Sequence, residues 1–222
     1  MFMHIRTLWS MRSRQFLFFL LMMFLGWITY VNFWWHGGSR DSFENELSGM
    51  TYIGVTWLII FVAEWTSGDL RQGVVSQFII RSSNRISFVC DRFMSVILVA
   101  SGASIVIFLM AAIFAKSGNT TDIKLLMGCL ATGIVYSLIA MFFSFLFRIS
   151  WLGALATFFV LIGLEPIVSK YISTRFGQFI SPEYYLSGFQ MGSPDVVSFL
   201  GCTTIVVLMF LGSLLTFRKV WI

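Results

Sequence analysis

Long apolar runs dominate this chain and set the first limit on its fold. Hydrophobic residues make up 58% of its 222 residues and charged residues only 11%, whereas a soluble domain carries about 25% charged residues. A helix that crosses a bilayer needs roughly 20 mostly apolar residues. Six runs approach that length: residues 15–33, 47–63, 93–115, 123–147, 149–165 and 197–217. We therefore predict an all-α membrane protein with six transmembrane helices, folded as a single domain over residues 1–222.

The N-terminal region has two interpretations. Arg6, Arg12 and Arg14 precede the first apolar run, which resembles the start of a signal peptide. The run is long for such a peptide, however, and bulky residues follow it at 32–36, where a cleavage site needs small ones. We expect a retained first span, preceded over residues 1–14 by a helix that lies in the membrane interface.

The distribution of Lys and Arg predicts the orientation. If the N-terminus is inside, ten of the fifteen Lys and Arg residues fall in inner segments. Such an excess marks the cytoplasmic side of membrane proteins, so both termini are expected in the cytoplasm. The basic isoelectric point near 9.4 then reflects inner loops that face anionic lipid. It gives no reason to expect nucleic acid as a partner.

Residues 64–92 form the longest polar segment on the predicted inner side. Apolar side chains repeat there at helical spacing: Leu70, Val74, Val75 and Phe78. This pattern predicts an amphipathic helix over about residues 69–80. A basic amphipathic helix between two spans either anchors the span ends in the interface or offers one face to a soluble partner.

Three further patterns concern packing. Small residues recur in the third and fourth spans, where they favour close helix contact: Ala100, Gly102, Ala103 and Ser104, with Gly128, Gly133 and Ser137. The scattered cysteines, Cys90, Cys129 and Cys202, are expected to be small buried hydrophobes. Residues 165–196 are too apolar for a free loop, so we expect short re-entrant or interfacial helices on the outer side.

The sequence lacks the patterns of several kinds of catalytic site. It contains no Gly-x-x-x-x-Gly-Lys-Ser/Thr phosphate-binding loop. Its two histidines, His4 and His36, fall on opposite sides of the predicted membrane, which excludes a histidine-based metal site. No histidine accompanies Ser101 or Ser104 to activate a nucleophile. We therefore expect no catalytic residue, no metal and no cofactor in this chain.

The 64–92 segment resembles the permease subunits of type-2 ATP-binding-cassette exporters. That family has a Glu at the inner end of its second span, a Gly about four residues later, an amphipathic stretch, and then Ser-x-Arg and a basic residue before the third span. The matching residues are Glu64, Gly68, Leu70, Ser83, Arg85 and Arg92. Asp91-Arg92 stands where the family often has Gly-Lys, and this difference leaves the subfamily open.

The resemblance implies a half-transporter of the bacterial inner membrane. A separate cytoplasmic ATPase subunit would bind ATP and dock on residues 69–82, and a second permease copy or a homologous permease would complete the pathway. The implied ATPase-coupling residues are Glu64, Gly68, Asp69, Leu70, Arg71, Val74, Phe78, Arg81, Arg85 and Arg92. Spans two and five would flank the pathway, with Tyr52, Thr56, Trp57, Phe158, Phe159 and Ile162 as lining candidates.

Two functions remain open from the sequence. The first is export of an amphipathic substrate, such as a peptide, an antibiotic or a lipid-like compound, driven by the partner ATPase. The second is a membrane sensor or immunity protein that binds a toxic peptide at residues 165–196 without transport. In the first case we expect Glu64 to pair with one of the nearby arginines, because an isolated carboxylate at a span end is costly. Such a pair would join the second span to the docking helix.

Overall fold

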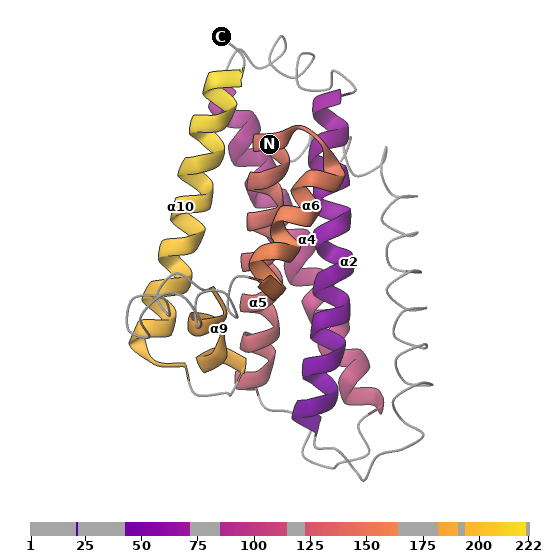
Figure 1. Ribbon diagram of the computed structural model, residues 1–222. Coiled ribbons are helices and arrows are strands. Elements are labelled where there is room, and N and C mark those ends of the chain that lie inside the picture. The colour runs from indigo at the N-terminus through magenta and orange to yellow at the C-terminus, as the bar shows by residue number, and fades with distance from the viewer. Residues whose placement is uncertain are drawn as a thin grey trace.

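The computed structural model describes residues 21, 43–71, 85–114, 123–163, 182–190 and 194–220. Apart from short turns, these residues are helical (Figure 1), which confirms the predicted all-α class. The helices are α2 (Phe43–Arg71), α4 (Arg85–Phe114), α5 (Ile123–Phe147), α6 (Ser150–Phe158), the π-helix η1 (Phe159–Gly163), α9 (Pro182–Gln190) and α10 (Val196–Val220). The elements expected at 1–14, 15–33, 72–84 and 164–181 lie outside the described residues.

Four helices are long and apolar enough to cross a membrane. Their spanning parts are Gly49–Leu70, Ile86–Met110, Leu125–Phe147 and Val196–Phe217. They correspond to the predicted second, third, fourth and sixth spans, and they mark the chain as a multi-pass membrane protein. The predicted fifth span is a shorter apolar helix over Ser150–Gly163. The first predicted span lies outside the described part of the chain, so the count of six stays a prediction.

Helix α5 forms the centre of the bundle. It packs against α2, α4, α6, α9 and α10, and in Figure 1 it lies behind α6 with the longer helices around it. Its spanning part is 67% buried, whereas that of α10 is only 17% buried. The core therefore follows α5, and α10 keeps most of its apolar surface for lipid.

Polar side chains within the spans bond mainly to their own helices. The hydroxyl groups of Thr51, Ser67 and Ser137 each donate to the carbonyl oxygen four residues earlier, over 2.6–2.7 Å. This bond satisfies a hydroxyl without help from water or from another helix. It explains how α2 continues through Ser67, which the hydropathy pattern alone places in a polar loop.

The small residues of the third and fourth spans pack α4 against α5, as predicted. Ala100 and Ala103 are buried, and the Gly133 backbone lies so close to the Ser104 hydroxyl that a side chain there would collide with it. Gly102 differs, because open space surrounds it. Cys129 and Cys202 are buried free thiols, in agreement with their predicted role as small hydrophobes.

A tight turn at Arg148 and Ile149 joins α5 to α6. Arg148 has a φ of 58°, in the left-handed region, and its backbone N–H donates to the carbonyl oxygen of Ser144 over 2.9 Å. This geometry ends α5, and α6 begins at Ser150. The turn sends α6 back along α5, where Gly153 lies against the Ser144 backbone.

The bounds of two predicted spans differ from those of the helices that contain them. Helix α2 continues past residue 63 to Arg71. Helix α4 includes Arg85, ahead of the predicted span start at residue 93. Both ends of the predicted 64–92 coupling segment are thus parts of long helices, and residues 69–71 belong to α2. The physical reason is that the charges near these ends are buried, as described below.

Candidate functional site

A buried ion pair joins the two helix ends that flank residues 72–84. The Asp69 carboxylate, in the last turn of α2, contacts the Arg92 guanidinium, in the second turn of α4. Asp69 is 1% exposed and Arg92 is 3% exposed. A buried charge is tolerated only when an opposite charge or hydrogen bonds compensate for its lost hydration. Asp69 can therefore be buried only because Arg92 compensates for its charge, and the same holds for Arg92.

Two aromatic rings complete this site. The Arg92 guanidinium carbon lies 4.4 Å from the centre of the Trp65 ring and 5.7 Å from the centre of the Phe88 ring. A guanidinium at such distances is attracted by the negative face of an aromatic ring. Trp65 precedes Asp69 by four residues on α2, and Phe88 precedes Arg92 by four on α4, so each helix presents one ring and one charge on the same face. We call these four residues the Asp69–Arg92 cluster.

Aromatic contacts extend the cluster across the bundle. Phe88 stacks on Phe217 of α10, with ring centres 5.4 Å apart, and Phe217 meets Phe145 of α5 edge to face at 5.8 Å. On the other side, the rings of Phe61 and Trp65 are 5.7 Å apart along α2. Since such pairs prefer defined geometries, a displacement of either helix end would change the ring contacts with α5 and α10.

The Trp65 indole nitrogen, within the cluster, and the hydroxyl of neighbouring Thr66 are both buried. Neither has a hydrogen-bond partner among the residues that the structure describes. Both belong to the last turns of α2, close to where the described chain stops before residue 72.

The predicted coupling residues fall into three groups. Glu64 is exposed, whereas Gly68 and Asp69 are buried and Leu70 is half-buried. Arg71 ends α2 and Arg85 begins α4. Val74, Phe78 and Arg81 lie outside the described residues. Arg92 forms a buried ion pair with Asp69, and the expected pairing of Glu64 with a nearby arginine stays a prediction. The structure thus brings together two predicted residues, Asp69 and Arg92, that the sequence did not pair.

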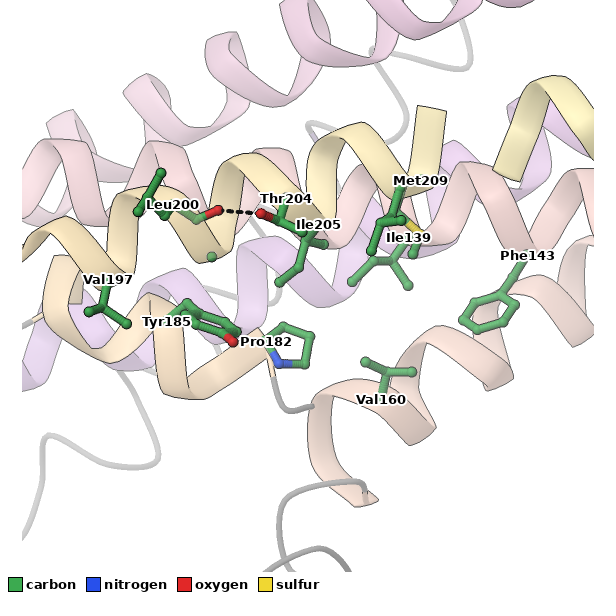
Figure 2. A pocket seen from close by; sticks show the side chains of 12 residues that line it. Ile139, Phe143, Val160, Pro182, Tyr185, Val197, Leu200, Thr204, Ile205 and Met209 are labelled. Atoms are coloured by element: carbon green, nitrogen blue, oxygen red, sulfur yellow. Dashed lines mark hydrogen bonds between the residues drawn. The ribbon is translucent and has the colours of Figure 1, made fainter. Parts of the chain in front are cut away.

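A second feature is a cavity of about 590 Å³ between α5, η1, α9 and α10. Figure 2 shows Ile139 and Phe143 from α5, Val160 from η1, and Pro182 and Tyr185 from α9 around this space. The α10 wall is formed by Val197, Leu200, Gly201, Thr204, Ile205, Leu208 and Met209. We call it the α5–α10 cavity. In Figure 1, helix α9, which forms one wall, lies at the end of the bundle opposite the C-terminal end of α10.

The six predicted pathway residues do not line this cavity. Tyr52, Phe159 and Ile162 are exposed, at 42%, 54% and 68%. Trp57 and Phe158 are half-buried and pack against the core, and Thr56 is half-buried. Helices α2 and α6 do pack side by side, as expected for spans two and five. Whether their outward residues line a pathway stays a prediction.

Part of the predicted outer element forms a fixed helix. Leu186 and Phe189 of α9 are buried, and Phe189 meets Phe199 of α10 edge to face at 4.8 Å. At the start of α10, the Ser198 backbone N–H donates to the Asp195 carboxylate over 2.7 Å. This is the geometry of a helix N-cap. Hydrogen bonds from Ser198 hold the pKa of Asp195 below its usual value of 3.8.

Comparisons with family models, curated proteins and solved structures find no match to this chain.

The sequence interpretation missed both the ion pair and the cavity. One signal for the pair was present: Trp65 with Asp69, and Phe88 with Arg92, repeat an aromatic and a charged residue at a spacing of four. The cavity left no comparable signal, because its residues come from four elements between positions 139 and 209.

Proposed function

We propose that the protein is the permease subunit of an ATP-binding-cassette exporter in the cell membrane. A separate cytoplasmic ATPase binds at residues 72–84 and supplies the energy. The substrate is amphipathic, such as a peptide, an antibiotic or a lipid-like compound. The observation that supports this most is the Asp69–Arg92 ion pair, because it joins α2 and α4 on either side of the segment that resembles a coupling region.

The cluster would make α2 and α4 move together. A displacement of residues 72–84 reaches both helix ends through the chain itself, and separating those ends would expose two buried charges. The helices therefore respond as one unit, and the contact of Phe88 with Phe217 passes the movement to α10. The sequence analysis expected Glu64 to join the second span to the docking segment. In this proposal Asp69 has that role, because it forms the ion pair with Arg92.

Co-purification with an ATPase tests the proposal. The tagged full-length chain is expressed together with the reading frames beside its gene and purified in mild detergent. We expect an ATPase that contains a phosphate-binding loop to elute with it, together with ATP hydrolysis. A Phe78→Ala variant, which inserts normally, should lose coupled ATPase activity, because Phe78 is the largest apolar anchor of the predicted docking face. A chain that never associates with an ATPase would exclude the proposal.

A second function is favoured by a different observation, the position of α9 beside the α5–α10 cavity. A sensor or immunity protein could bind an amphipathic toxic peptide there without transporting it. Protection of cells that persists when the ATPase is catalytically dead would support this function. Loss of protection in those cells would support export.

A further inference from the structure

The walls of the α5–α10 cavity are almost entirely hydrocarbon. Among its twelve lining residues, only Thr204 and Tyr185 carry a polar side-chain group. The Thr204 hydroxyl donates to the Leu200 carbonyl oxygen over 2.7 Å, as the dashed line in Figure 2 shows. None of the described residues that line the space is charged. A polar ligand buried against such walls would leave its hydrogen-bonding groups unsatisfied, which is costly. The ligand must therefore be apolar over most of its surface.

The cavity opens on the side of α10 that faces lipid. Val197, Leu200 and Leu208 belong to its wall and are 45%, 63% and 55% exposed. They lie on a helix that is long and apolar enough to cross the membrane and whose spanning part is only 17% buried. Around such a helix the surrounding medium is the acyl chains of the bilayer. A ligand can thus pass from the bilayer into the cavity without crossing water.

Close packing forms the walls of the cavity. Tyr185 of α9 lies directly over Gly201 of α10, and a side chain at position 201 would occupy the space of its ring. Buried Leu186 and Phe189 hold α9 in place. On the opposite side, Val160 belongs to the π-helix η1, a rare geometry that is often found at functional sites. The volume of about 590 Å³ falls within the range of about 300–1,000 Å³ that is typical of small-molecule sites.

We propose that the α5–α10 cavity binds a hydrocarbon chain of an amphiphile, whose polar head stays outside the cavity. Chemically, an acyl chain of a bilayer phospholipid and the acyl chain of a lipid-like cargo are equivalent ligands for these walls. Binding of a bilayer lipid does not depend on the exporter function, whereas binding of cargo rests on it.

Photo-crosslinking in liposomes tests the proposal. The full-length protein is reconstituted with a phosphatidylcholine that carries a diazirine in one acyl chain, and labelled peptides are located by mass spectrometry. We expect the label on peptides of α9 and on the cavity face of α10. No partner ATPase is present, so the result does not depend on the co-purification described above.

Two neighbouring threonines provide a matched pair of variants. Thr204 lines the cavity, whereas Thr203 is exposed on α10 but does not line it. Thr204→Trp fills the space and should abolish the label at the cavity. Thr203→Trp places the same ring at nearly the same depth and should leave the label unchanged. Equal helicity by circular dichroism and equal monodispersity show that both variants fold.

Several results would overturn the proposal. Absence of label at the cavity in the wild-type protein would mean that another segment, such as residues 164–181, or a second copy fills it. Equal loss of label in both tryptophan variants would mean that the label reports the outer surface of α10.

A competition experiment decides whether the bound hydrocarbon chain belongs to a bilayer lipid or to cargo. An acylated peptide with one hydrocarbon chain is added to the labelled liposomes. Displacement of the cavity label by the acylated peptide, but not by the same peptide without its chain, identifies a cargo-like ligand. Label that neither peptide displaces identifies a resident bilayer lipid.

Discussion

Asp69 and Arg92 carry opposite charges at a place where water does not reach either of them. Together they cost little, because each charge compensates for the other, but removing one leaves the second buried and uncompensated. Such a pair constrains helix position more strictly than apolar packing does. Hydrophobic contact is non-directional, whereas an ion pair requires its two charged groups to stay close together. This is the physical basis for regarding the cluster as a mechanical joint between α2 and α4.

Asp69→Asn should therefore destabilise the protein strongly. We expect a loss of about 3–5 kcal/mol, the usual cost of breaking a buried ion pair, seen as a lower melting temperature in detergent. Glu64→Gln is the matched control, because it removes the same charge from an exposed position of the same helix, and should change stability by less than about 0.5 kcal/mol.

A double variant separates charge from packing. Asp69→Leu combined with Arg92→Met replaces the pair by apolar groups and should recover most of the stability that either single change loses. If the single variants melt at the wild-type temperature, the pair does not hold the helices together. If the double variant stays as unstable as the singles, packing rather than the buried charge explains the loss.

Asp195 gives a residue-scale prediction that depends on pH. Its pKa is lowered in the folded protein by hydrogen bonds from Ser198, so the cap stabilises α10 above the unfolded pKa and is lost as pH falls through the folded pKa. Asp195→Ala should reduce amide hydrogen-exchange protection at residues 197–199 at pH 6. Below the folded pKa, the variant and the wild type should converge. An equal difference at both pH values would show that the carboxylate charge is not involved.

At the scale of helices, the contact between α5 and α6 depends on the absence of a side chain. A Cβ at Gly153 would lie 3.0 Å from the Ser144 Cα and 3.1 Å from its backbone nitrogen. These are backbone atoms, so no rotamer change relieves the contact. Gly153→Ala should cost about 1–3 kcal/mol, as overpacking usually does, measured as thermal stability in detergent.

Gly102→Ala is the control for that experiment. Nothing lies within 4 Å of a Cβ at Gly102, and alanine is the better helix former by about 1 kcal/mol. This variant should be as stable as the wild type or more so. Equal destabilisation by both alanines would mean that the two glycines are needed for backbone flexibility, and not for close packing.

The same helices show what the sequence could and could not predict. Hydropathy located the second, third, fourth and sixth spans, because a length of apolar residues is a property of the chain alone. The spacing of small residues predicted close helix packing, and Ser104 and Gly133 form such a contact between α4 and α5. The continuation of α2 past residue 63 did not follow from hydropathy, because Asp69 is neutralised by Arg92, a partner 23 positions away. The cavity depends in turn on how Tyr185 meets Gly201, which only the packed structure decides.

At the scale of the whole molecule, α2 has an outward face that the described helices leave uncovered. Tyr52 and Ile60 lie on it, at 42% and 41% exposed, with Thr56 between them at helical spacing. A half-transporter would meet its second copy there, since span two was expected to flank a shared pathway.

Cysteine crosslinking tests that assembly. In a chain without its three native cysteines, Tyr52→Cys and Ile60→Cys should give disulfide-linked dimers in native membranes. Val207→Cys, which is 48% exposed on α10, should stay monomeric. Dimers from all three positions would indicate random collisions. If neither α2 position gives a dimer, this face of α2 is covered by lipid or by residues 15–33 and not by a second copy.

The ion pair between α2 and α4 also has a consequence for how the chain is made. These two helices are synthesised before α5, against which most of the bundle later packs. A lone charge entering lipid is resisted during insertion, but α2 and α4 can leave the insertion machinery with Asp69 and Arg92 already paired. We expect a chain truncated after residue 122 to insert both helices in a protease-protection assay, and Arg92→Leu to impair insertion of that fragment. Equal insertion of both fragments would contradict this order. The pair would thus be needed first at biogenesis, before α5 or any partner subunit arrives.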